Sequence, residues 1–394
     1  MSVPAEQLTP IEIGERLRIA REVANKTQAD AALAIDVART TLIAIEQGHR
    51  RARLSEVQKL AKLYKTSVNA ILRREAVHVD LSPRFRKLEI GRDVKAVDEA
   101  VTLLADLAKA EVELENLLGI KRVRNYPPER PLLPGDVRAQ AEQDALELRQ
   151  RLGLGFAAIS DVVTLLEMEL GIRVFVRRFD GRISGLFAYD DELGACILLN
   201  ANHPRERRTQ SAGHEMGHFI STRNKPEILH LEDEGNSREE RYAHAFGRAL
   251  LTPPRAVMQK FHEVTAGSSK LTRRHLIVLA HFFGVSREAI TRRLEELGLT
   301  KTGTWDWFAS NGGITDEQAR QVLGDLTPQD TQKIEADRPM TLRLNLLAAE
   351  VHRRGLLSEG QLARLLRLTR VELRESLEGV ESDETDSDGV VSLE

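Results

Sequence analysis

The string from Ser211 to Phe219 contains the pattern His-Glu-x-x-His and constrains the fold more than any other part of the sequence. Residues four apart share one face of an α-helix, so a helix here directs the imidazoles of His214 and His218 toward one ion. Catalytic zinc sites use three protein ligands and keep a fourth position open. Glu215 lies beside that face, where its carboxylate can serve as a general base. The pattern predicts a helix that carries two of three metal ligands.

The third ligand is expected from a second helix at about residues 237–250. Glu240 is the predicted ligand, because Glu239 points about 100° away on a helix with 3.6 residues per turn. His244 follows one turn later and leaves three roles open: it could orient a ligand, compete as a ligand, or fill a polar position. Two histidines and one glutamate suit Zn²⁺, with Mn²⁺ as the alternative. Three nearby polar residues are weaker candidates for stabilising an oxyanion, and a structural role is more typical of them: Tyr242, His203 and His230.

Three short strand patterns precede these helices, and Asp/Gly turns separate them. They cover Arg173–Arg177, Ile183–Tyr189 and Ala195–Asn200. The remainder of the chain has mostly helical periodicity. We therefore expect a mainly α fold with a small antiparallel β-sheet. The last strand could bind an extended substrate at an exposed sheet edge, or it could be an ordinary core strand.

Residues 136–300 resemble the ImmA/IrrE family of metallopeptidases. Three features carry the resemblance: the apolar strand 196–200 before the basic stretch 205–208, the motif Ala212-x-His214-Glu215-x-Gly217-His218, and the motif Glu240-x-x-Ala243-x-Ala245-Phe246 followed by Leu250-Leu251-x-Pro253. The resemblance implies an α+β, zincin-like domain with His214, His218 and Glu240 as ligands and Glu215 as base. This chain departs from the family at His244, where Asn or Asp is usual, and at Gly247, where Ala is usual. A glycine inside a helix indicates close backbone packing.

Residues 11–74 predict five short helices and resemble the Xre/Cro-type repressor domain, which is all-α and binds DNA through a helix-turn-helix. The resemblance rests on Thr27-Gln28, on the turn at 35–38 and on Ile45-Glu46-x-Gly48. Thr27 is expected to cap the second helix, and Gly48 to end the third with positive φ. Ala38 departs from the Ser or Thr that commonly caps the third helix.

In that geometry the start of the third helix enters the major groove of double-stranded DNA. The side chains expected to face base edges are Arg39, Thr40 and Thr41. Gln28 is expected to bind phosphate or to support that contact. The arginines expected to meet the phosphate backbone are Arg50, Arg51 and Arg53. Residues 1–80 carry 13 Lys and Arg against 10 Asp and Glu, so DNA binding could require a homodimer.

The expected domains follow from these patterns and from a Pro-rich break at 119–136. They are a helix-turn-helix domain at 1–75, a helical linker at 76–135, the peptidase domain at 136–300, a helical C-terminal domain at 301–379 and a disordered acidic tail at 380–394. Within the linker, the helical pattern at 94–118 could supply a dimer contact or pack between domains.

The composition places the chain in a reducing compartment and away from membranes. The 394 residues include one cysteine, which excludes an intramolecular disulfide. The N-terminus lacks the apolar core of a signal peptide, and no apolar run approaches the ~20 residues that span a bilayer. The net charge is −3. We therefore expect a cytoplasmic protein.

These observations predict a DNA-binding regulatory zinc metallopeptidase. The resemblance suggests that its protein substrate is a helix-turn-helix repressor, cut in response to stress. Two alternatives remain open. The first is a transcription regulator whose inactive peptidase-like domain serves as a sensor or dimerisation platform. The second is an antitoxin-like component of a toxin-antitoxin module.

Overall fold

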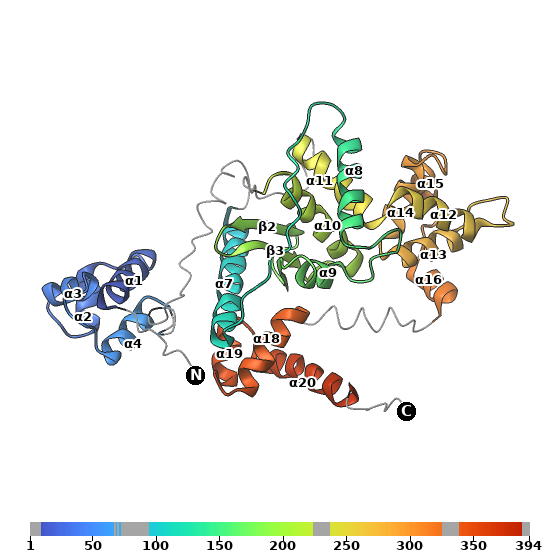
Figure 1. The fold of residues 1–394 in the computed structure, drawn as a ribbon. Helices are drawn as coiled ribbons and strands as arrows, with labels where there is room; N and C mark the ends of the chain where they lie inside the picture. The colour runs from blue at the N-terminus through green and yellow to red at the C-terminus, as the bar shows by residue number, and fades with distance from the viewer. Residues whose placement is uncertain are drawn as a thin grey trace, which may run out of the picture. The chain divides into compact units, whose positions relative to one another are not determined.

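The structure is a computed structural model that describes residues 9–66, 68, 71, 94–223, 237–324 and 339–387 (Figure 1). It divides into two compact units, Met1–His78 and Val79–Glu394. Within the described ranges, no helix is long and apolar enough to cross a membrane.

The N-terminal unit is a small helical domain with its own apolar core. Its helices are α1 (Pro10–Val23), α2 (Gln28–Ala34), α3 (Arg39–Glu46) and α4 (Leu54–Leu63). Leu17, Leu42 and Leu60 are fully buried between them. Thr27 caps α2 and Gly48 has a φ of 74° after α3, so both predicted helix-end signals are confirmed. The fifth expected helix falls largely outside the described residues.

A three-stranded sheet lies at the centre of the second unit. Its strands are β1 (Arg173–Arg177), β2 (Gly185–Asp190) and β3 (Gly194–Asn200), in the order β1-β3-β2. β2 and β3 form an antiparallel pair, whereas β1 runs parallel to β3. The expected small sheet is present, but it is mixed rather than wholly antiparallel. The chain crosses from β1 to the far side of β3 before β2 begins. The turn residues between the strand patterns do not indicate such a crossing.

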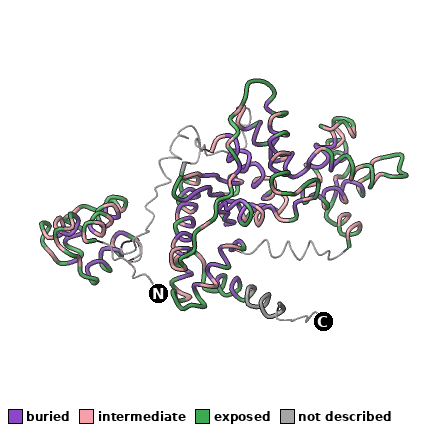
Figure 2. Tube along the Cα trace, in the orientation of Figure 1, coloured by how far each residue is buried: buried purple, intermediate pink, exposed green. Residues whose placement is uncertain are grey.

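β3 is the central strand and is buried along its whole length (Figure 2). The hypothesis that this strand offers an exposed edge to substrate is therefore wrong, because both of its edges are hydrogen-bonded to neighbours. A strand buried on both faces shows a continuous apolar run instead of alternation, which is why Cys196–Leu199 did not reveal its position.

Helices cover one face of the sheet and form the larger apolar core. They are α8 (Val137–Arg151), α9 (Val162–Met168), α10 (Arg205–Ser221) and α11 (Arg238–Leu251). α10 packs on β2 and β3, and α11 packs between α10 and α8. Asp161 caps α9: its carboxylate accepts from the backbone N–H of Val163 at 2.9 Å.

The long helix α7 (Val94–Leu118) packs against β1, β3 and α18 (Leu342–Arg353). Leu104, Leu107 and Leu114 of α7 are fully buried within the chain. Of its two expected roles, packing within the chain therefore fits this helix better than a dimer contact. The other helices are α12 (Pro254–Thr265), α13 (Arg273–Phe283), α14 (Arg287–Glu296), α15 (Thr304–Ser310), α16 (Asp316–Leu323), α19 (Glu359–Leu365) and α20 (Arg370–Ser387).

Two sequence expectations about segments differ from the structure. The Pro-rich stretch 119–136 was expected to separate domains, yet its backbone hydrogen-bonds to the segment expected to form the following domain: Asn125 donates to Leu170 O at 3.1 Å and Arg130 donates to Ile220 O at 2.7 Å. α20 extends to Ser387 and so includes the first part of the tail expected to be disordered. Residues 388–394 lie outside the described residues.

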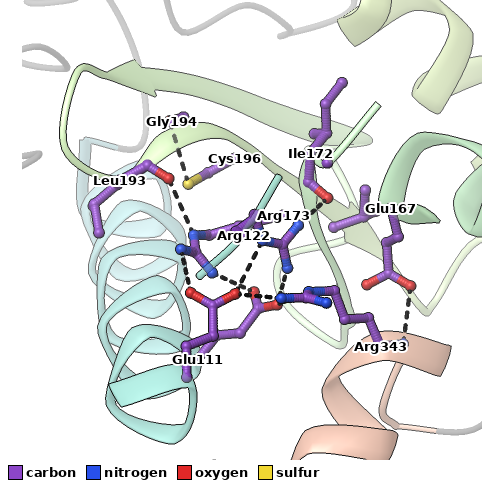
Figure 3. Close-up of polar contacts among 12 residues, drawn as sticks. Glu111, Arg122, Glu167, Ile172, Arg173, Leu193, Gly194, Cys196 and Arg343 are labelled. Atoms are coloured by element: carbon purple, nitrogen blue, oxygen red, sulfur yellow. Dashed lines mark hydrogen bonds and ion pairs between the residues drawn. The ribbon is translucent and has the colours of Figure 1, made fainter. Parts of the chain in front are cut away.

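A buried cluster of arginines and glutamates joins α7, the Pro-rich stretch, β1 and α18 (Figure 3). The Glu115 carboxylate accepts from Arg173 and from Arg343, each at 2.8 Å, and Arg122 pairs with Glu111. Burial alone would raise the pKa of Glu115, but these arginines outweigh it and lower that pKa to about 2. Removing one partner from such a group would leave an uncompensated buried charge and would destabilise the fold. The cluster therefore holds the C-terminal helices against the sheet.

Candidate metal centre

The site depends on the close approach of α10 and α11. A Cβ added to Gly217 would lie 2.6 Å from Ala243 Cα, and one added to Gly247 would lie 2.8 Å from the carbonyl carbon of Gly213. Real side chains cannot enter these spaces, so the small residues let the two backbones touch. The structure agrees with the expectation that Gly247 indicates close packing.

This approach brings together the three side chains predicted as ligands. His214 Nε2 and His218 Nε2 are 3.0 Å apart. Glu240 Oε1 lies 3.4 Å from His218 Nε2, and Glu240 Oε2 lies 3.5 Å from His214 Nε2. All three side chains are at least nine-tenths buried. The spacing of four along α10 and the choice of Glu240 over Glu239 thus agree with the geometry.

These separations fit a single divalent ion. Zinc bonds to histidine nitrogen and carboxylate oxygen are about 2.0–2.2 Å, which places the corners of a tetrahedron about 3.3–3.6 Å apart. Both distances from Glu240 lie within that range, and the distance between the two imidazole nitrogens is slightly shorter. Two imidazoles and one carboxylate are also the donor set of many catalytic zinc sites. The residues present therefore fit Zn²⁺.

Glu215 lies on the neighbouring flank of α10, facing the start of β2. Only 2% of this residue is exposed. A methyl group added to Gly185 would lie 3.0 Å from Glu215 Oε1, so the missing side chain of Gly185 leaves room for the carboxylate. Burial, and then the nearby charge of Glu240, raise the pKa of Glu215 well above its usual value. A divalent cation in the cluster would favour the ionised form and so oppose both effects.

His244 stands at the open side of the cluster. Its Nε2 lies 3.8 Å from Glu240 Oε2, and its ring centroid lies 4.4 Å from that of His214. The partial burial of its ring lowers the pKa of His244, and the Glu240 carboxylate opposes that effect. Its side chain is 55% exposed, in contrast to the buried ligands beside it.

Of the three candidates for stabilising an oxyanion, the two that the structure describes make hydrogen bonds elsewhere in the fold. The Tyr242 hydroxyl is buried and donates to Asp144 Oδ2 at 2.7 Å. His203 Nε2 lies 2.8 Å from the carbonyl oxygen of Gly181, in the loop before β2. Both contacts are structural. His230 lies outside the described residues. Sequence reasoning missed Gly185, and a glycine at the start of a strand is only a weak signal of close approach.

The N-terminal unit places its predicted DNA-contacting residues around the start of α3. Gln28 links one of them, Arg39, to Glu46: its amide nitrogen donates to Glu46 Oε2 at 3.3 Å, and its amide oxygen accepts from Arg39 at 3.1 Å. Glu46 is held in turn by a buried pair with Arg21 at 2.7 Å. Gln28 thus supports the Arg39 side chain, which is one of the two roles expected for it.

The other predicted contacts differ in how free they are to meet DNA. Thr40 and Arg51 are exposed, and Thr41 is half-buried. Arg50 is engaged within the domain, because its guanidinium donates to both carboxylate oxygens of Glu56, at 2.9 and 3.1 Å. Ala38 precedes α3 without a side-chain cap, as its sequence predicts.

Comparisons with known proteins match two parts of the chain. The family described as the IrrE N-terminal-like domain matches residues 167–295, which contain His214, His218 and Glu240. The family described as Helix-turn-helix matches residues 17–71, which contain α2 and α3. A comparison with curated proteins finds no match.

Proposed function

Because this chain joins a helix-turn-helix domain to an IrrE N-terminal-like, metallopeptidase-like domain, we propose that it is a DNA-binding regulator that cleaves a specific protein. The observation that carries the proposal is the convergence of His214, His218 and Glu240 at separations of 3.0–3.5 Å beside a buried Glu215. We propose a helix-turn-helix repressor as the substrate, since the resemblance to the ImmA/IrrE family suggests that class.

The chemistry assigned to each residue follows from its position. His214, His218 and Glu240 would hold Zn²⁺, which when bound polarises a carbonyl and activates water for hydrolysis. Glu215 would accept a proton from the attacking water and pass it to the leaving amine. The buried setting of Glu215 excludes bulk solvent from that transfer.

An extended substrate fits the edge strand β2 better than the central strand β3. β2 is paired on one side only among the described residues, and Gly185 at its start adjoins Glu215. A peptide added along this edge would satisfy its backbone groups through strand pairing. Its scissile bond would then lie near the base and the metal ligands.

The decisive experiment compares the full-length protein with its Glu215→Gln variant in the presence of Zn²⁺. Each is incubated with helix-turn-helix repressors encoded nearby, and fragments are followed by electrophoresis. Glu215→Gln should lower the cleavage rate by about 10²–10⁴-fold, the usual contribution of a general base, while zinc content stays unchanged. Glu239→Gln, on the same helix as the third ligand but pointing away, is the matched control and should cut normally.

Equal cutting by the Glu215→Gln protein would refute the assigned mechanism. Footprinting with and without a chelator separates the proposal from the inactive-sensor alternative. If the protein binds a specific DNA sequence but no tested repressor is cut in the presence of Zn²⁺, the peptidase-like domain is better explained as a sensor or dimerisation platform.

A further inference from the structure

The face of α11 that carries Glu240 carries a second metal-binding side chain one turn later. The ligand atoms of His214, Glu240 and His244 all lie within 4.8 Å of one another. Two of the three proposed ligands, His214 and Glu240, therefore have a further possible donor close by, whereas His218 is not a member of this group. We propose that His244 is a fourth protein ligand, which occupies the corner of the zinc site that a catalytic centre leaves open. This inference rests on the proposed zinc site.

The geometry favours a ligand over an orienting role. A residue that orients Glu240 would donate a hydrogen bond to it within about 3.2 Å. The 3.8 Å between His244 Nε2 and Glu240 Oε2 exceeds that distance. Two atoms bound to one zinc ion at about 2.0–2.2 Å are about 3.3–3.6 Å apart, so His244 Nε2 would move slightly nearer to Glu240 Oε2 on binding.

The four side chains differ in burial. His214, His218 and Glu240 have side chains exposed by 8%, 3% and 3%, so packing holds them in place. The His244 side chain is 55% exposed, so the protein core constrains it less than the other three. An imidazole bound at the open corner would exclude solvent and substrate, and one turned outward would admit them.

The consequence is a latent site that His244 closes. Four protein ligands in a tetrahedron are the arrangement of structural zinc sites, and three with an open corner are that of catalytic sites. Exchange of the imidazole for another ligand forms and breaks only one metal–ligand bond and needs no oxidant or further reactant. The wild-type protein should therefore bind zinc more tightly, and accept small competing ligands less readily, than a variant without this imidazole.

The test uses the full-length protein loaded with Zn²⁺ or Co²⁺, and the variants His244→Asn and His244→Ala. Zinc affinity is measured by competition with a chromophoric chelator. The visible absorption of Co²⁺, which reports its ligand set, is followed while acetohydroxamate is added. We expect both variants to bind zinc about tenfold more weakly and to bind acetohydroxamate at least several-fold more tightly. His262→Asn, which alters an exposed histidine on α12, is the matched control and should behave as wild type.

Unchanged zinc affinity and an unchanged Co²⁺ spectrum in both His244 variants would overturn this inference and leave the proposed peptidase standing. Failure of the wild-type protein to bind zinc or cobalt would overturn both. Because His244 is half-exposed at the rim, both substitutions should leave the fold intact, and circular dichroism checks that expectation.

Discussion

Gly217 is the position where a single methyl group tests the whole site. Replacing it with alanine places a Cβ 2.6 Å from Ala243 Cα and 3.0 Å from Ala243 O. Carbon atoms in contact are normally about 3.5–4.0 Å apart, so α10 and α11 must separate by roughly 1 Å. The obstacle is backbone on both sides and cannot rotate away.

The separation acts on zinc binding more than on stability. Metal–ligand distances tolerate about ±0.2 Å, and the two imidazoles and Glu240 lie on the two helices being separated. We expect zinc affinity to fall by at least tenfold. Overpacking costs about 1–3 kcal/mol, but alanine regains up to ~1 kcal/mol of helix propensity. The free energy of unfolding without metal should therefore fall by about 2 kcal/mol or less.

Zinc affinity is measured by chelator competition, and stability by urea unfolding of the metal-free protein. Gly360→Ala in α19 is the control, since its added methyl meets only the flexible end of Arg370 at 3.1 Å. That variant should keep wild-type zinc affinity. If Gly217→Ala binds zinc as tightly as wild type, the helices are not held at the separation that the ligands need, and the reasoning fails.

Three other perturbations address the buried charges and the DNA-binding domain. Burial raises the pKa of Glu167 to about 8, so its neutral form is favoured on folding and stability is lost as pH rises from about 4.5 to 8. Glu167→Gln should therefore gain stability relative to wild type over that range, by up to about 5 kcal/mol in urea unfolding, and a pH-independent difference would contradict the cause. Arg173→Met removes one ion-pair partner from Glu111 and from Glu115 and should lower the free energy of unfolding by about 3–5 kcal/mol. An unchanged urea midpoint would show that the cluster adds nothing to stability. Arg39→Ala should weaken binding to a specific operator by about 10–100-fold in a gel-shift titration, and equal loss on random DNA would argue against base contact.

Local patterns were sufficient to predict the elements that carry the site. The spacing of His214 and His218, the choice of Glu240 and the segment Arg173–Arg177 all depend on helix or strand periodicity, which the structure reproduces. Caps such as Thr27 depend on residues three apart. These interactions span only a few residues, so the sequence contains them directly.

Only the tertiary structure determined which segments of the chain lie in contact with one another. The crossing that makes β2 the edge strand depends on which of three consecutive strands pair, which no single strand pattern determines. The contact of Gly185 with Glu215 and the pairing of Glu115 with Arg343 join segments that are separated in the chain. The Pro-rich stretch has the composition of a linker, yet its backbone hydrogen bonds make it part of the second compact unit. Such contacts depend on which faces of the helices and strands pack together. The hydrophobic periodicity of one segment shows which of its faces is buried, but it does not determine which other segment covers that face.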